Sequence, residues 1–163
     1  MKKPMFLLLF TFLVSLTLSA CSDGGSSNKI PETSLTPQEM VGKLVQQYEQ
    51  PPQAELDADE VKNLYHLDPA LLEAYSIKTP LMNVKTNEVA VLKVKDAKDL
   101  ETVKKAVEQR AADVQKQFES YLPDQYENAK NYKTAEQGSY VLFVIDEHAD
   151  EMVTAFNAFF EKK

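Results

Sequence analysis

The sequence predicts an α+β domain in which a small antiparallel sheet of two hairpins packs with a long central helix, a C-terminal helix and short N-terminal helices. Residues 89–95 and 140–145 are rich in β-branched and aromatic residues, and a turn signal precedes each stretch. Apolar residues at helical spacing follow each of them. Shorter segments with helix-capping signals come before the first hairpin.

The N-terminal part of this domain contains two capping signals. Thr36 and Glu39 form a capping box that begins a first helix, which must end before Pro51. Asp57 and Glu60 mark the beginning of a second, shorter helix. We therefore expect two short helices ahead of the sheet.

The first hairpin is predicted from an alternating stretch, residues 75–79, and from the apolar strand at residues 89–95. Residues 85–88 form the turn before the second strand. Pro80 cannot donate a ladder hydrogen bond, so we expect the first strand to lie at an edge of the sheet.

The long central helix begins with Asp96 as its cap, and Pro123 marks its end or a kink. One face of the helix is apolar and should pack on the sheet. The residues of this stripe are Leu100, Val103, Val107, Ala111, Val114, Phe118 and Tyr121.

The second hairpin comprises residues 132–136 and 139–145 and turns at Gln137 and Gly138. Residues 140–145 are apolar on both faces, so this strand should be central. Helices then cover one face of the sheet, and an N-terminal helix covers part of the other. A last helix follows Asp146; its apolar residues are Met152, Val153, Phe156, Phe159 and Phe160.

Residues 91–103 and 141–153 are alike at an offset of 50, with six identical positions, and the two hairpin turns also align. A ββα-ββα pseudo-repeat would explain this match. A chance agreement between two strands that each precede an aspartate and a helix would explain it equally well.

The N-terminal segment has the features of a secretory signal peptide. Two lysines, Lys2 and Lys3, precede an apolar stretch at residues 5–18 that is too short to span a bilayer comfortably. We predict a signal peptide at residues 1–20, a flexible tether rich in glycine and serine at residues 21–35, and a single domain at residues 36–163.

Residues 18–21, Leu-Ser-Ala-Cys, resemble the lipobox of bacterial lipoproteins. The resemblance implies cleavage after Ala20 and attachment of a lipid to Cys21. Each buried CH₂ of an acyl chain contributes about 0.8 kcal/mol, so several chains would hold the protein firmly at a membrane. The alternatives are an ordinary secreted protein and an uncleaved signal anchor.

Composition excludes some functions. Cys21 is the only cysteine, so a chain lipidated there has no disulfide. The net charge of −7 becomes more negative once Lys2 and Lys3 leave with the signal peptide, which argues against nucleic-acid partners and anionic lipid headgroups.

Catalytic motifs are not evident. The sequence contains no Gly-x-Ser-x-Gly elbow and no glycine-rich phosphate loop. His148 lies in the acidic stretch Asp-Glu-His-Ala-Asp-Glu, which could supply metal ligands, although acidic residues also suit the first turn of a helix. His66 is expected at a helix end. We expect no cofactor and no metal site.

Arg110 and three tyrosines are the candidate residues for a ligand or interaction surface. Arg110 lies at the edge of the apolar stripe, where it either pairs with a buried acid or extends to the surface. Tyr121, Tyr126 and Tyr140 cluster around the connection from the long helix to the second hairpin, where they either line a binding lip or pack in the core.

The sequence contains the stretches "LYHLDPALLEAY", "EQRAADVQKQFESYLPDQYENAK" and "GSYVLFVID", and across the last two it has an Arg, Phe-x-x-Tyr-x-Pro, Tyr, Gly-x-Tyr pattern. In these features it resembles the domain of unknown function 4358 family of small lipoprotein domains from Gram-positive bacteria, mainly Firmicutes. The resemblance covers about residues 38–160. The family often has glycine, which suits a tight turn, at the position where this chain has His66. The resemblance therefore does not by itself imply a tight turn at His66. The matching positions are Arg110, Phe118, Tyr121, Pro123, Tyr126, Gly138 and Tyr140.

We therefore expect a lipid-anchored, extracytoplasmic domain of the cell envelope that binds another component and is not an enzyme. Its partners would be the membrane, through the lipid on Cys21, and an unknown envelope protein or ligand. A metal-dependent envelope hydrolase using His148 and a small-ligand carrier using the tyrosines are the alternatives.

Overall fold

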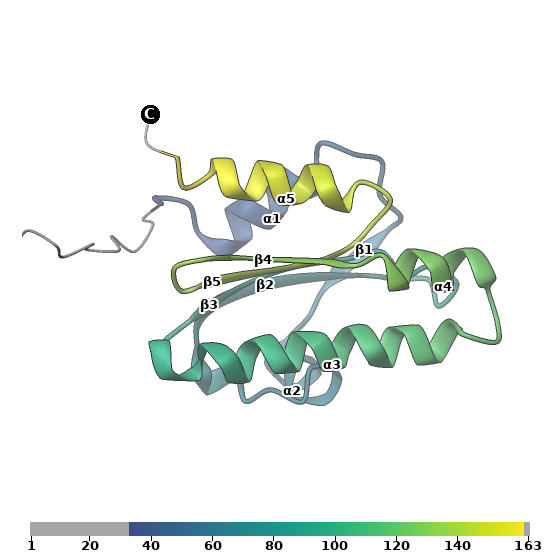
Figure 1. Cartoon of the computed structure of the whole chain (residues 1–163), viewed down its shortest axis with the longest axis horizontal. Helices are drawn as coiled ribbons and strands as arrows, with labels where there is room; N and C mark the ends of the chain where they lie inside the picture. The colour runs from purple at the N-terminus through teal and green to yellow at the C-terminus, as the bar shows by residue number, and fades with distance from the viewer. Residues whose placement is uncertain (1–32, 162–163) are drawn as a thin grey trace, which may run out of the picture.

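The domain consists of a five-stranded antiparallel sheet with helices on both faces (Figure 1). The structure is a computed structural model, and it describes residues 33–161. The strand order is β1-β2-β3-β5-β4. The strands are β1 (Gln53–Glu55), β2 (Leu72–Pro80), β3 (Glu88–Val94), β4 (Lys133–Gln137) and β5 (Tyr140–Ile145).

The two faces of the sheet carry different helices and separate cores. Helices α1 (Pro37–Val45) and α5 (Ala149–Ala158) cover one face. Helices α2 (Ala58–Leu64), α3 (Leu100–Phe118) and α4 (Pro123–Lys130) cover the other, with α4 packed on α3. The predicted fold class is confirmed, but the C-terminal helix shares its face with α1 and not with the long helix.

The predicted capping boxes are confirmed, because they depend only on neighbouring residues. The Thr36 hydroxyl accepts from the Glu39 backbone N–H at 3.2 Å, and the Glu39 carboxylate accepts from the Thr36 N–H at 2.8 Å. Asp57 and Glu60 exchange the same two bonds, at 2.9 and 2.8 Å. Both boxes satisfy N–H groups that a helix leaves without intrahelical partners.

The apolar stripe of the central helix is buried as predicted from Val103 to Phe118, and Leu100 is partly buried. The predicted end of the stripe is wrong, because Tyr121 lies beyond the last residue of α3 and is exposed. The predicted cap is wrong: Asp96 precedes a short 3₁₀ helix, Ala97–Asp99, and its side chain makes no capping hydrogen bond. Helix α3 ends at Phe118, and Pro123 begins a separate helix, α4, where its missing N–H costs nothing.

Two predictions about strand positions are wrong. Pro80 does not place its strand at an edge, because β1 pairs outside β2 and sets Gln53 opposite Pro80. Since Pro80 is the last residue of β2, its missing donor interrupts no further ladder bond. Strand β5 is buried along its whole length, but the central position belongs to β3.

The residues that match at an offset of 50 do not occupy equivalent places. Val91 lies opposite Leu142 in the core under α1 and α5, whereas Leu92 lies opposite Val141 in the core under α3. Val91 and Val141 therefore face opposite sides of the sheet, since one step along a strand reverses the face. Helices α3 and α5 also lie on opposite faces.

The domain has two distinct ends. At the near end, Thr33–Leu35 lie against Phe159, just beyond the last turn of α5. At the far end lie the β2–β3 loop (residues 81–87), the Asp146–His148 connection and the α3–α4 connection (Figure 1). The chain therefore enters the domain at the end opposite the β2–β3 loop.

The predicted signal peptide, Cys21 and most of the predicted tether lie outside the described residues. Within residues 33–161, no helix combines the length and the apolar character that crossing a membrane requires.

Candidate functional site

At the far end of the domain, three consecutive polar residues form hydrogen bonds to different elements of the fold. They are Thr86, Asn87 and Glu88. Thr86 and Glu88 are buried. Because successive residues of an extended segment point in different directions, each of the three contacts a different part of the fold. Thr86 bonds to α4, Asn87 to the β5–α5 connection and Glu88 to α2 and α3.

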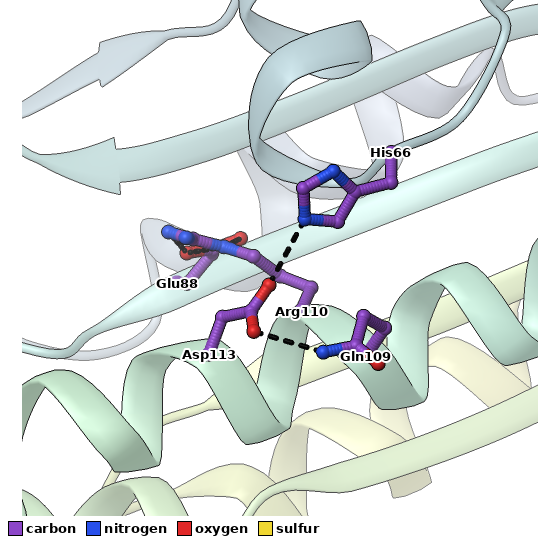
Figure 2. Close-up of polar contacts among 5 residues, drawn as sticks. All are labelled: His66, Glu88, Gln109, Arg110 and Asp113. Atoms are coloured by element: carbon purple, nitrogen blue, oxygen red, sulfur yellow. Dashed lines mark hydrogen bonds and ion pairs between the residues drawn. The ribbon is translucent and has the colours of Figure 1, made fainter.

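Glu88 forms a buried ion pair with Arg110 of α3 (Figure 2). The Arg110 Nη2 lies 2.6 Å from Glu88 Oε2, and Nε lies 3.0 Å from Oε1. The two side chains are only 13% and 1% exposed, so the pair is shielded from water. This bidentate geometry is the strong form of a charge-assisted hydrogen bond.

Tyr65, at the end of α2, completes this cluster. Its hydroxyl donates to Glu88 Oε1 at 2.5 Å, and the Arg110 guanidinium lies 5.9 Å from its ring centroid. Burial, with the Glu88 charge added to it, raises the pKa of Tyr65 well above 10.0. Burial opposes the charge on Arg110, but Glu88, together with Tyr65 and Asp113, outweighs this effect and raises the pKa of Arg110. The Glu88 and Arg110 charges thus compensate each other within the cluster.

Polar side chains, His66, Gln109 and Asp113, lie at the outer rim of the cluster (Figure 2), and His66 and Asp113 are exposed. Asp113, one turn along α3 from Arg110, accepts from Gln109 Nε2 at 2.8 Å and lies 3.2 Å from His66 Nε2. His66 has φ = 52°, in the left-handed region that favours glycine. His66 therefore has a backbone conformation that glycine adopts without strain.

At the far end of the domain, directly after the last residue of β5, Asp146 borders two clefts. Its carboxylate accepts from Gln50 Nε2 at 2.8 Å, from Asn87 Nδ2 at 3.0 Å and from the His148 backbone N–H at 2.8 Å. The larger cleft has a volume of about 480 Å³. Its lining residues are Glu49, Gln50, Pro51, Pro52, Met82, Lys85, Asn87, Asp146, Glu147 and His148.

The second cleft, of about 350 Å³, lies towards α4 and also borders Asp146 and Glu147. Beside it, Gln125 of α4 accepts from the Thr86 N–H at 3.0 Å and from its hydroxyl at 3.1 Å. Asn128 donates to the same hydroxyl at 3.0 Å. These bonds join the base of the β2–β3 loop to α4.

The tip of the β2–β3 loop exposes apolar side chains. Leu81 is 67% exposed, and Met82 and Val84 are also exposed. The loop is nevertheless held in place, because the Leu81 N–H donates to the Pro52 carbonyl at 2.8 Å and the Lys85 N–H to the Met82 carbonyl at 3.1 Å. The far end thus presents apolar side chains on an ordered loop.

The structure does not gather the predicted site residues into one surface. Arg110 belongs to the buried cluster, which settles its position in favour of pairing with an acid. Tyr126 packs at the edge of the same core, and Tyr121 is 62% exposed at the far end. Tyr140 is buried in the other core, where its ring packs against Phe160. The four residues therefore form no common binding lip.

The two histidines also lie apart. The His148 ring stacks on Tyr48 at 4.4 Å, and its Nδ1 lies 3.9 Å from Glu151. His66 contacts Asp113 on the other face of the sheet. In the described part of the chain, no group of three or more His, Cys, Asp or Glu side chains is placed to hold a metal ion.

Sequence reasoning missed Glu88, Asn87 and Asp146 as members of polar clusters. It assigned the first two to a turn and placed the third only as the residue before the last helix. An acidic residue that directly precedes an apolar strand was the available signal for Glu88, because a charge at that position needs a partner when the strand is buried.

Comparison with known proteins finds one match. The family model described as "Domain of unknown function (DUF4358)" matches residues 46–146, which include all the residues of the buried ion-pair cluster and Asp146. No curated protein and no solved structure matches the chain.

Proposed function

The chain belongs to the DUF4358 family, and from this premise we propose that it is a lipid-anchored, non-catalytic domain that binds another component of the cell envelope. It would be held on the outer face of the cytoplasmic membrane of a Gram-positive bacterium. The far end of the domain would carry the binding surface.

The anchoring half of the proposal is supported by the sequence at residues 18–21 and by the lysines and apolar stretch before it. The chain from Cys21 to Thr33 can span roughly 40 Å at most, since each residue adds about 3.4 Å. The beginning of an anchored domain would therefore stay within roughly 40 Å of the membrane.

The observation that carries the binding half is the position of the exposed apolar side chains. Leu81, Met82, Val84 and Tyr121 are all large, exposed and at the far end. A domain gains no stability from leaving such side chains in water, and a group of them marks an interaction surface. Because the chain enters at the near end, a lipid on Cys21 leaves the far end free to meet a partner.

Site-specific crosslinking in intact cells tests the binding half. A photo-crosslinking residue in place of Met82 should give a defined adduct, whereas the same residue in place of Lys98, at the near end, should not. The double variant Leu81→Ser, Val84→Ser should lose the adduct while its urea unfolding midpoint stays the same. Equal adducts from both positions, or none from Met82, would refute binding through the far end.

A further inference from the structure

Asp146 is a buried carboxylate that forms no ion pair with a cation of the described chain. Its side chain belongs to a residue only 5% exposed, and all three of its hydrogen-bond donors are neutral amides. Within residues 33–161, no lysine, arginine or histidine forms an ion pair with Asp146, Glu49 or Glu147. Glu88 is also buried, but its charge is paired with that of Arg110. Asp146 has no such partner.

The carboxylate of Asp146 also retains accepting capacity. A carboxylate has about four lone-pair sites. The Oδ2 atom accepts from Gln50 and Asn87, whereas Oδ1 accepts only from the His148 N–H. One site on Oδ1 therefore remains for a further donor, and Asp146 borders both clefts.

The larger cleft is lined by both acidic and apolar side chains, and Asp146 is one of the acids. Pro51, Pro52 and Met82 supply the apolar side, and Glu49 and Glu147 add two further carboxylates. The one lysine in the lining, Lys85, also acts on Asp124 at the second cleft, where it helps Gln125 to lower the pKa of that carboxyl. The cleft thus presents three acids against one lysine, next to apolar side chains.

We propose that this cleft binds a basic side chain of the envelope partner, with Asp146 as the acceptor for the ammonium of a lysine or the guanidinium of an arginine. The apolar side of the cleft takes the aliphatic stem of that side chain, and Leu81 and Val84 contact apolar residues flanking it. The proposal rests on the proposed function, because it specifies the partner chemistry of the same far end. The acids make an anionic lipid surface the wrong occupant.

Nuclear magnetic resonance titration of the full chain in detergent micelles tests this with two probe peptides. One is acetyl-Leu-Lys-Leu-amide, and the other has norleucine in place of lysine. The lysine peptide should shift the amide signals of Asn87, Glu147 and His148, and the norleucine peptide should bind at least about tenfold more weakly, as expected for losing a charged hydrogen bond. Equal effects of the two peptides, or none at about 10 mM, would overturn the proposal.

Variants then assign the effect to Asp146. Asp146→Asn should weaken binding of the lysine peptide about tenfold or more. Asp59→Asn removes the same charge on α2, across the sheet, and should leave binding unchanged. If Asp146→Asn disturbs the fold, Glu147→Gln still tests the charge of the cleft and should weaken binding a few-fold. Equal shifts with calcium chloride instead of the peptide would indicate a metal-ion site and refute the proposal.

The peptide result is independent of the crosslinking result. If the adduct at Met82 forms but proves insensitive to Asp146→Asn and to added salt, the far end binds a partner without using a basic side chain. If the lysine peptide binds the cleft but no adduct forms at Met82, the cleft recognises cations and the proposed function fails.

Discussion

Arg110 and Glu88 connect α3 to the central strand β3, with Arg110 Nη2 2.6 Å from Glu88 Oε2. The pair lies within one core of the sheet, where Tyr65 adds a third polar group. Arg110→Met would leave the Glu88 carboxylate buried without a cation. We expect the free energy of unfolding to fall by about 3 kcal/mol, measured by urea unfolding.

The double variant Arg110→Met, Glu88→Leu provides the control for this pair. Replacing both members removes the unpaired charge and fills the space with apolar groups, so most of the lost stability should return. A double variant no more stable than Arg110→Met alone would show that the loss has another origin, such as packing.

Tyr65 should make the stability sensitive to alkaline pH. Burial and then Glu88 raise its pKa well above 10.0, so the unfolded chain loses the phenol proton first as the pH rises. The contribution of Tyr65 to the free energy of unfolding is therefore full below about pH 10 and is lost towards the folded pKa. Urea unfolding from about pH 9 to about pH 11 should show a steeper loss for the wild type than for Tyr65→Phe. Tyr121→Phe, at an exposed site, should leave the slope unchanged.

His66 has a positive φ that costs energy for any residue with a Cβ atom. His66→Gly should raise the free energy of unfolding, and His66→Ala should be less stable than His66→Gly by about 1 kcal/mol. Thermal unfolding of the two variants gives the comparison directly. Equal stability of the glycine and alanine variants would mean that the turn relaxes in solution.

Cys21 should determine where the protein is found in the cell. Cys21→Ala removes the thiol to which a lipid would attach, so metabolic labelling with a fatty acid should be lost. Ser22→Ala is the matched control and should keep the label. Labelling that persists in Cys21→Ala would refute anchoring at this residue.

Much of the fold followed from local sequence signals. The two capping boxes and the stripe from Val103 to Phe118 depend on residues three or four apart, so the chain carries them without reference to the rest of the fold. Strand β1 was missed because three residues carry no alternation, and only its pairing with β2 makes it a strand.

The candidate site was predictable only in part. Arg110 was a candidate because it lies at the edge of the apolar stripe. The sequence allowed it either to pair with a buried acid or to extend to the surface. Its partner Glu88 is 22 residues away in the sequence, and Gln50 is 96 residues from Asp146. No periodic pattern connects residues so far apart, because their meeting depends on how the layers pack.

The sequence by itself indicated the two capped N-terminal helices, the apolar stripe of α3, the C-terminal helix and the two hairpins, because each depends on residues close together along the chain, but it gave no sign of α4 as a separate helix. Tertiary structure decided the strand order, the face that each helix covers, the Glu88–Arg110 pair and the acidic cleft at Asp146. These depend on the desolvation of charged and apolar groups when α3 and α5 close over opposite faces of the sheet.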